Sequence, residues 1–291
     1  MLFRTANIIL GTVLRAAGDT KTPMHVGVAF NIINIVLNFF LIYSTRTVEV
    51  CGKTLVIPGA GWGVEGAAAA SAVAYTIGGI AIIYKLWKHP DVSPKGQSLF
   101  PNMTVLRPCL KVAVPNMFQR FATSLGYVAF ASMINSLGQI STAAHTIANT
   151  VESAFYIPGW GMQTAAATLA GNALGADDSK KLKGLAKAIM PLEVGLMVIS
   201  GSLLFIFAPV LIRLFSSDDQ VITLGSTVLR MVAISEPFYG VPIVIEGMMQ
   251  GVGKTVAPFI FNVAGMWGVR ILGTFICIHL LGFGLVSAWG C

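Results

Sequence analysis

The chain has 291 residues and a net charge of +7, and 55% of its residues are hydrophobic while only 11% are charged. A water-soluble domain carries about 25% charged residues, so this composition excludes an ordinary soluble protein. Several apolar runs exceed the roughly 20 residues that cross a bilayer as a helix. Because backbone amides in lipid must bond within their own helix, we predict an all-α membrane protein.

The predicted elements are seven membrane-spanning helices with a partial helix at each end. Residues 2–14 are typical of the end of a helix that begins before Met1, and residues 284–291 are typical of the beginning of another. We therefore expect the chain to be a fragment, truncated at both ends. The seven complete spans are expected at residues 24–43, 62–87, 108–136, 141–174, 184–214, 220–250 and 257–281.

Lysine and arginine are concentrated in alternate connections between the predicted spans. Loops 15–23, 88–107, 175–183 and 251–256 contain or adjoin most of them, whereas the opposite connections contain few. Short basic loops remain in the cytoplasm, so these four loops are predicted to be cytoplasmic. The positive charge therefore indicates membrane topology, and no nucleic-acid partner is expected.

No pattern in the sequence indicates an enzyme, a metal centre or a cofactor site. The segment 253–255 (GKT) is similar to the end of a phosphate-binding loop, but Met248 stands where that loop requires glycine. The histidines have no zinc spacing, and no Ser-His-Asp grouping indicates a hydrolase. The cysteines have no paired spacing that would indicate a disulfide or a metal site; they are Cys51, Cys109, Cys277 and Cys291.

Two copies of a short motif indicate an internal duplication. The segment 15–23 (RAAGDTKTP) recurs as 250–258 (QGVGKTVAP), with glycine, threonine and proline at matching places. Six predicted spans separate the copies, and an even number returns the chain to the same side of the membrane, so the repeats are parallel. Parallel repeats with the substrate between two halves are one architecture of secondary transporters. The alternative is chance recurrence of a common turn sequence.

These motifs resemble those of the multidrug and toxic compound extrusion (MATE) family. Segment 15–23 is similar to the loop after the family's fourth helix. Residues 143–148 (AAHTIA) and 169–176 (LAGNALGA) are similar to the eighth helix and its cytoplasmic exit, and residues 247–258 to the end of the tenth. The resemblance covers nearly the whole chain, from the fourth helix into the twelfth.

The resemblance implies a two-lobe helical transporter that exchanges Na⁺ or H⁺ for organic, often cationic, compounds and has no resident cofactor. Residues 1–88 would belong to the N-terminal lobe, 89–107 to a cytoplasmic linker, and 108–291 to the C-terminal lobe. The implied partners are the lipid bilayer and small organic substrates. The full-length protein would be a monomer in the cell inner (plasma) membrane. A flippase for lipid-linked oligosaccharides or polysaccharides, from the same superfamily, is the alternative; it would require a more cationic cavity.

The substrate and ion cavity is expected where polar side chains share one face of an apolar helix. In span 24–43, amides recur at helical spacing. They could bind an ion or a substrate, or they could hold helices together at about 0.6–2 kcal/mol each, and both interpretations stay open. These candidates are Asn31, Asn34 and Asn38.

Three further polar faces are expected to converge on a cavity in the C-terminal lobe. A charge at the bilayer centre costs about 2.5–3.5 kcal/mol on insertion scales, so such residues usually face a cavity or a partner. The candidates are Asn116, Gln119, Arg120 and Thr123 of span 108–136, Asn149, Glu152 and Tyr156 of span 141–174, and Glu236, Tyr239 and Glu246 of span 220–250.

The depth of these residues along their helices predicts one ion pair. At about 1.5 Å per residue, Arg120 and Glu236 lie at similar depths, so we expect them to approach each other. Glu152 lies nearer the outer surface and would be free to hold a proton that competes with a bound cation. A static ion pair or a capping hydrogen bond is the alternative for Glu152.

The sequence departs from the family in its acidic residues. By the resemblance, NorM-type members carry a glutamate in the seventh helix and an aspartate in the tenth. Thr123 and Tyr239 occupy those places here, and neither holds a proton reversibly near neutral pH. The coupling group is therefore expected to be Glu152, Glu236 or Glu246, or to lie in the helices that precede this sequence.

Overall fold

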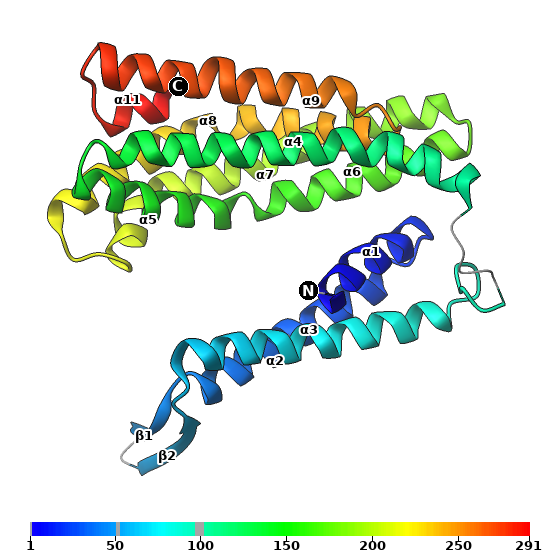
Figure 1. The fold of residues 1–291 in the computed structure, drawn as a ribbon, viewed down its shortest axis with the longest axis horizontal. Helices are drawn as coiled ribbons and strands as arrows, with labels where there is room; N and C mark the ends of the chain where they lie inside the picture. Colours follow the sequence, from blue (N-terminus) through cyan, green and yellow to red (C-terminus); the bar gives the residue numbers. More distant parts are fainter. Residues whose placement is uncertain (1, 51–52, 97–101) are drawn as a thin grey trace. The chain divides into compact units, whose positions relative to one another are not determined.

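A computed structural model describes residues 2–50, 53–96 and 102–291 of the chain (Figure 1). The chain divides into two units, residues 1–100 and 101–291, and each is described by itself. Cys51 and part of the expected linker 89–107 lie outside the described residues.

The N-terminal unit consists of three helices and a β-hairpin. Its helices are α1 (Leu2–Ala16), α2 (Lys21–Leu41) and α3 (Gly63–Trp87), and α3 packs against both of the others. Gly18, with φ of 92°, turns the chain between α1 and α2, where a side chain would be strained. The predicted spans 24–43 and 62–87 correspond to α2 and α3.

Small residues along α3 allow its neighbours to approach closely. Gly66, Ala70, Ala74 and Gly78 recur every four residues and are all buried. A Cβ atom at Gly66 would lie only 2.5 Å from the carbonyl oxygen of Leu41, so α2 and α3 can meet there only through glycine. Close packing of this kind holds helices together in lipid, where no hydrophobic force acts between them.

The hairpin between α2 and α3 was not predicted from the sequence. Strands β1 (Ser44–Val50) and β2 (Lys53–Ala60) pair antiparallel, with a register shift between Ser44 and Arg46. The alternating β-branched residues of both strands favour this structure. The segment is too short to span a bilayer, so its length alone predicted a connection between two spans.

The C-terminal unit is a bundle of long helices. Its elements are α4 (Met103–Asn135), α5 (Gln139–Phe155), α6 (Ile157–Gly175), α7 (Ser179–Arg213), α8 (Asp219–Gly251), α9 (Val256–Val263), the π-helix η1 (Ala264–Ile271), α10 (Leu272–Phe275), the π-helix η2 (Ile276–Leu280) and α11 (Leu285–Gly290). Helices α4, α7 and α8 begin where a side-chain oxygen of Asn102, Asp178 or Asp218 accepts a hydrogen bond from a backbone N–H of the first turn, which satisfies an otherwise free donor.

Four predicted spans differ from the observed helices. The span expected at 184–214 begins earlier, at Ser179, and the span expected at 257–281 is formed by α9, η1, α10 and η2 in turn. The span expected at 141–174 is divided at Tyr156 into α5 and α6, because Pro158 in the first turn of α6 has no N–H to continue the helical ladder. The span expected at 108–136 begins earlier, at Met103, with Asn102 as its cap. The division leaves Tyr156 at the junction of α5 and α6.

Helix α8 is the centre of this bundle and packs mainly against α7, α6 and α5. Gly247 and Gly251 bring it close to α6: Cβ atoms there would lie 2.4 Å from the carbonyl oxygen of Gln163 and 2.1 Å from that of Ala167. The largest apolar core of the unit is formed by buried residues that include Phe130, Ile134, Leu204, Ile212, Val228 and Leu229.

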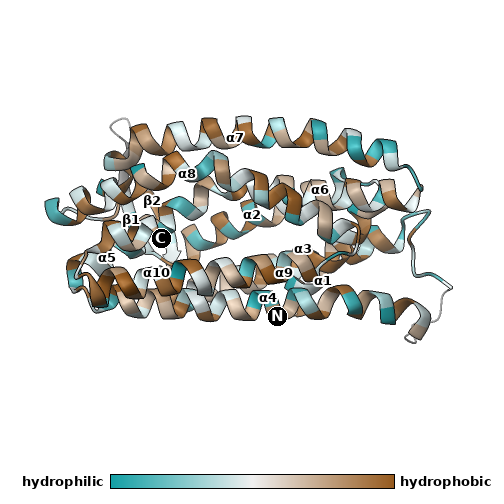
Figure 2. Cartoon of the chain, turned by 90° about the horizontal axis from the view of Figure 1, so that it is seen from above, coloured by the Kyte–Doolittle hydropathy of each residue, from teal (hydrophilic) through white to brown (hydrophobic). Residues whose placement is uncertain are grey.

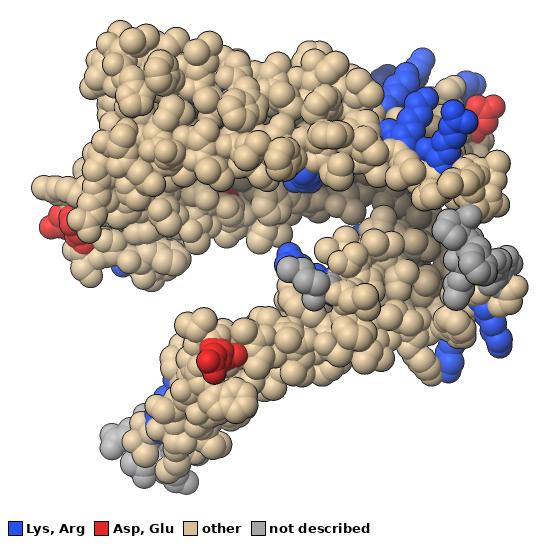
Figure 3. Space-filling model, in the orientation of Figure 1, with Lys and Arg blue, Asp and Glu red and all other residues tan. Residues whose placement is uncertain are grey.

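The surface of both units is that of a membrane protein. Within the described residues, five helical stretches are long and apolar enough to cross a bilayer: α2, α3, α7, α8 and 256–280. Large apolar side chains are exposed, with Phe238 at 78%, and apolar residues extend along most helices in Figure 2. Lysine and arginine gather at one end of the C-terminal unit (Figure 3), where α7 begins with Lys180, Lys181 and Lys183. The predicted all-α membrane fold is confirmed.

Candidate functional site in the C-terminal helical bundle

Glu152, Tyr156 and Tyr239 form a compact group where the α5–α6 junction meets α8. The Tyr156 hydroxyl donates a hydrogen bond to Glu152 Oε1 at 2.9 Å, which the i, i+4 spacing of the two residues permits. The Tyr156 and Tyr239 ring centroids lie 5.0 Å apart at an interplanar angle of 40°. Two aromatic rings and one carboxylate therefore line the same place.

Glu236 lies next to this group and is completely buried. It precedes Tyr239 by three residues on α8, its exposed fraction is 0%, and neither carboxylate oxygen has a hydrogen-bond partner among the described residues. Its charge interacts with those of Glu152 and Glu193. An unpaired buried carboxylate is very costly, so Glu236 requires a proton or a bound cation. We call Glu152, Tyr156, Glu236 and Tyr239 the Glu152 cluster.

Glu193 is a buried acid that the sequence analysis missed. It is the sole acidic residue of α7, it is 0% exposed, and neither of its carboxylate oxygens has a hydrogen-bond partner in the described part of the chain. Gly159 of α6 and Gly240 of α8 make room for it: Cβ atoms there would lie 3.0 Å and 3.5 Å from Glu193 Oε1. The signal was available, because an acid inside a long apolar span is by default a functional candidate.

Glu246 is held by three amide donors from two further helices and its own. Gln119 Nε2 of α4 donates to Glu246 Oε1 at 2.8 Å, Gln250 Nε2 donates to the same oxygen at 2.9 Å, and Asn262 Nδ2 of α9 donates to Oε2 at 3.2 Å. Asn262 was not among the predicted residues. Through these three bonds this group, the Glu246 cluster, ties α4, α8 and α9 together.

Arg270 supplies a positive charge beside the Glu152 cluster, and the sequence analysis missed it too. Its guanidinium carbon lies 4.5 Å from the ring centroid of Phe130, 5.6 Å from that of Tyr127 and 5.8 Å from that of Trp289. Cation–π attraction of this kind holds a guanidinium in place. The charge of Arg270 also interacts with that of Glu152, so the site carries one cation against several acids.

The expected ion pair between Arg120 and Glu236 is wrong. Arg120 is exposed, and both carboxylate oxygens of Glu236 lack any partner among the described residues. Depth along a helix fixes the level of a side chain in the membrane but leaves open the direction in which it points. On α4 it is the preceding residue, Gln119, that turns inward and is 7% exposed.

The remaining candidates of the C-terminal unit take no part in these clusters. Asn116 is half-buried and its Oδ1 has no hydrogen-bond partner among the described residues, Thr123 is half-buried, and Asn149 is exposed. No three histidine, cysteine, aspartate or glutamate side chains of the described chain gather as a metal site would require.

The amides of the N-terminal unit mostly bond to their own helix or to α3. Asn34 Nδ2 donates to the Ser71 hydroxyl of α3 at 3.3 Å, and Asn38 Nδ2 donates to Asn34 Oδ1 at 3.1 Å. Asn31 Nδ2 donates to the Gly27 carbonyl of the same helix. These bonds are of the kind that hold helices together, which was one of the two interpretations of this stripe.

Comparison with known proteins gives a consistent result for sequence and fold. The MatE family model matches residues 115–276. The chain is 27% identical over 281 residues to a probable multidrug resistance protein NorM of Thermotoga maritima, covering 97% of this chain and 58% of that protein. It is 27% identical over 292 residues to the probable multidrug resistance protein YpnP of Bacillus subtilis, covering 99% and 59%.

Solved structures show the same fold. A MATE structure in complex with MaL6 matches with a TM-score of 0.84 at 21% identity, covering 98% of this chain and 61% of that one. A MOP superfamily transporter from Pyrococcus furiosus matches with a TM-score of 0.85 at 23% identity, covering 97% and 61%. The chain thus spans about three fifths of the length of the proteins that it matches, and the resemblance drawn from the loop motifs is confirmed.

Proposed function

Because this chain belongs to the MatE family, whose members are multi-pass proteins of the plasma membrane, we propose that the full-length protein exports organic, mainly cationic, compounds in exchange for Na⁺ or H⁺. Residues 1–88 and 108–291 would belong to the two lobes of an alternating-access transporter, with residues 89–107 connecting them. The names of the similar proteins from Thermotoga maritima and Bacillus subtilis, both probable multidrug resistance proteins, support this class of substrate.

The observation that carries the proposal is the Glu152 cluster. It combines two acids, one of them buried without a hydrogen-bond partner among the described residues, with the adjacent, tilted rings of Tyr156 and Tyr239. Aromatic faces attract organic cations, and a carboxylate can exchange a proton for a cation. A substrate cation that approaches the rings would compete for the carboxylate with a proton or Na⁺, and this competition is the physical basis of exchange.

The hydrogen bonds of the acids indicate which one couples. Glu246 accepts bonds from three amides, so a change of partner at this carboxylate would break three contacts. Glu152 receives one bond, from Tyr156, and is only partly buried. Glu152 can therefore change its partner at little cost, and we assign it the coupling role, with Glu236 as the acid whose charge it senses.

The test is efflux of a fluorescent cationic dye from cells that express the full-length protein and lack their own pumps. Glu152→Gln keeps the size and the Tyr156 contact but cannot ionise, and it is expected to reduce efflux at least tenfold. Glu65→Gln is the matched control, because Glu65 is an exposed acid in the first turn of α3, and it should transport as the wild type does.

Two outcomes would contradict different parts of the proposal. If the wild type moves no dye at any Na⁺ concentration or pH, the exporter function fails. If Glu152→Gln transports normally and keeps the ion dependence of the wild type, export stands but Glu152 is not the coupling residue. Varying Na⁺ at constant pH, and pH at constant Na⁺, identifies the ion.

A further inference from the structure

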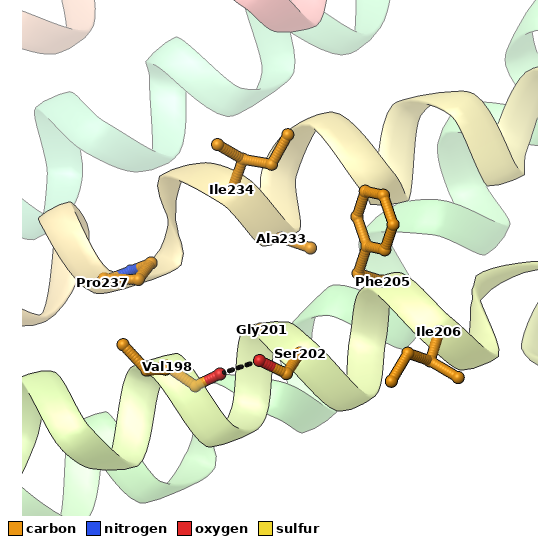
Figure 4. Close-up of a pocket in the computed structure, with 8 residues that line it drawn as sticks. All are labelled: Val198, Gly201, Ser202, Phe205, Ile206, Ala233, Ile234 and Pro237. Atoms are coloured by element: carbon orange, nitrogen blue, oxygen red, sulfur yellow. Dashed lines mark hydrogen bonds between the residues drawn. The ribbon is translucent and has the colours of Figure 1, made fainter.

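An apolar groove runs between α7 and α8 on the outside of the C-terminal unit. It has a volume of about 340 Å³ and is lined by Val198, Gly201 and Phe205 of α7 and by Ala233, Ile234 and Pro237 of α8 (Figure 4). Its one hydroxyl, that of Ser202, donates to the Val198 carbonyl of its own helix at 2.6 Å. The side chains that line the groove are therefore almost all apolar, and the groove suits a hydrocarbon chain.

A single positive charge lies beside this groove. The Arg230 guanidinium carbon is 5.5 Å from the ring centroid of Phe205, which forms part of the groove wall. Arg230 is exposed, and among the described residues it has no acidic partner. A cation without an acidic partner on a surface of apolar side chains either binds an anion that the protein does not supply or lies at the lipid–water interface.

The depth of Arg230 matches the level of lipid headgroups. Helix α8 has 33 residues, or about 50 Å, so about 10 Å extends beyond each side of a hydrocarbon core of about 30 Å. Arg230 lies about 16 Å from Asp219 at the start of the helix. Its side chain leans toward that start and can extend outward, which brings the guanidinium to the boundary of the core.

The groove extends inward from that level. Ala233, Ile234 and Pro237 follow Arg230 along α8, deeper in the membrane, and Val198 of α7 lies deeper than Phe205 because the two helices are antiparallel. With the basic loops in the cytoplasm, Asp219 lies at the outer surface. A headgroup at Arg230 would therefore place its acyl chain directly in the groove.

We propose that the α7–α8 groove binds one anionic phospholipid of the outer leaflet, with the lipid phosphate on Arg230 and an acyl chain between Phe205 and Pro237. The net negative headgroup matches the unpaired guanidinium, and the apolar lining matches the chain. The groove adjoins the Glu152 cluster through Gly201 and Pro237, which neighbour Glu236, but the binding of a lipid there does not depend on the proposed transport function.

The test uses the purified full-length protein and native mass spectrometry, with phosphatidylglycerol and phosphatidylcholine of identical acyl chains as probes. One arginine near the membrane surface contributes about 1 kcal/mol to the binding of an anionic lipid, so phosphatidylglycerol should be retained roughly fivefold better. Arg230→Gln should abolish this preference. Arg213→Gln, which removes an equally exposed arginine at the end of α7, should keep it.

Two further experiments separate the contribution of the lipid headgroup from that of the acyl chain. Ser202→Phe fills the groove and should reduce retention of both lipids, whereas glycerophosphate, which has no acyl chain, should displace neither. Arg230→Lys keeps the charge and should keep the preference, which guards against a folding defect in Arg230→Gln. The proposal is overturned if Arg230→Gln still prefers phosphatidylglycerol, or if Arg213→Gln loses the preference equally.

Discussion

The contact of α8 with α6 gives the sharpest prediction about stability, because it depends on two glycines and two backbone carbonyls. Alanine at position 251 would place its Cβ atom 2.1 Å from the Ala167 oxygen, whereas real Cβ contacts are essentially never shorter than 3.0 Å. The obstacle is backbone, so no side chain can rotate away. Helix α6 would have to retreat by about 1 Å, and overpacking of this kind costs about 1–3 kcal/mol.

A matched control separates this clash from the general effect of replacing glycine in a helix. Gly195 lies within α7 and has no atom within 4 Å of the place of a Cβ. There, alanine should stabilise the helix by about 0.5–1 kcal/mol, since it loses less backbone entropy on folding. The two substitutions are chemically identical, yet Gly251→Ala should destabilise the protein and Gly195→Ala should not.

The assay is the temperature at which the full-length protein in detergent loses its monodisperse peak in size-exclusion chromatography. Gly251→Ala should lower this midpoint by several degrees, and Gly195→Ala should leave it unchanged or raise it. If the thermal midpoint of Gly251→Ala equals or exceeds that of the wild type, the close approach of α6 and α8 at Gly247 and Gly251 does not stabilise the bundle.

Two further predictions concern acidic residues outside the Glu152 cluster. Glu246→Gln replaces one acceptor oxygen by an NH₂ donor that faces other donors. The thermal midpoint should therefore fall by the equivalent of about 1–3 kcal/mol, whereas substitution of the exposed Glu65 by Gln should not change it. An equal midpoint for the two variants would contradict the structural role of the Glu246 cluster. Hydrogen bonds from the side chain and the backbone N–H of Thr22 lower the pKa of the half-buried Asp19 below its ordinary 3.8. The stabilisation, about 0.5 kcal/mol after solvent screening, is therefore present above pH 3.8 and is lost as the pH falls through the lower folded value. Asp19→Asn should therefore lower the thermal midpoint at neutral pH but not at pH 2. A difference from the wild type that does not depend on pH would refute a stabilising role for the Asp19 carboxylate.

The helices could be predicted from the sequence because their cause is local. Apolar runs of sufficient length must be helical in lipid, and every predicted span is helical over most of its length, although several ends and divisions differ. Features that depend on shorter segments were missed. The hairpin 44–60 is too short to span a bilayer, and the division at Tyr156 depends on the single residue Pro158.

The candidate site could be predicted only in part, because sequence spacing gives the level of a residue and its face relative to its own helix. The helical spacing of the sequence grouped Glu152 with Tyr156 and Glu236 with Tyr239, and the structure brings these two pairs together. It could not give the rotation of α4, on which the inward position of Gln119 and the exposed position of Arg120 depend. That rotation is set by packing against other helices.

The hydrogen bonds of the acids distinguish their roles better than their depth does. Glu246, Glu152 and Glu236 all lie on helices of one bundle, and the sequence left all three as candidates for coupling while it favoured Glu152. They accept bonds from three amides, from one hydroxyl and from no described residue, respectively. A fully bonded carboxylate loses energy when it changes partner, whereas one with a single bond can exchange a proton for a cation. The number of hydrogen bonds falls from Glu246 to Glu152 to Glu236, and this supports the proposal that Glu246 has a structural role and Glu152 the coupling role.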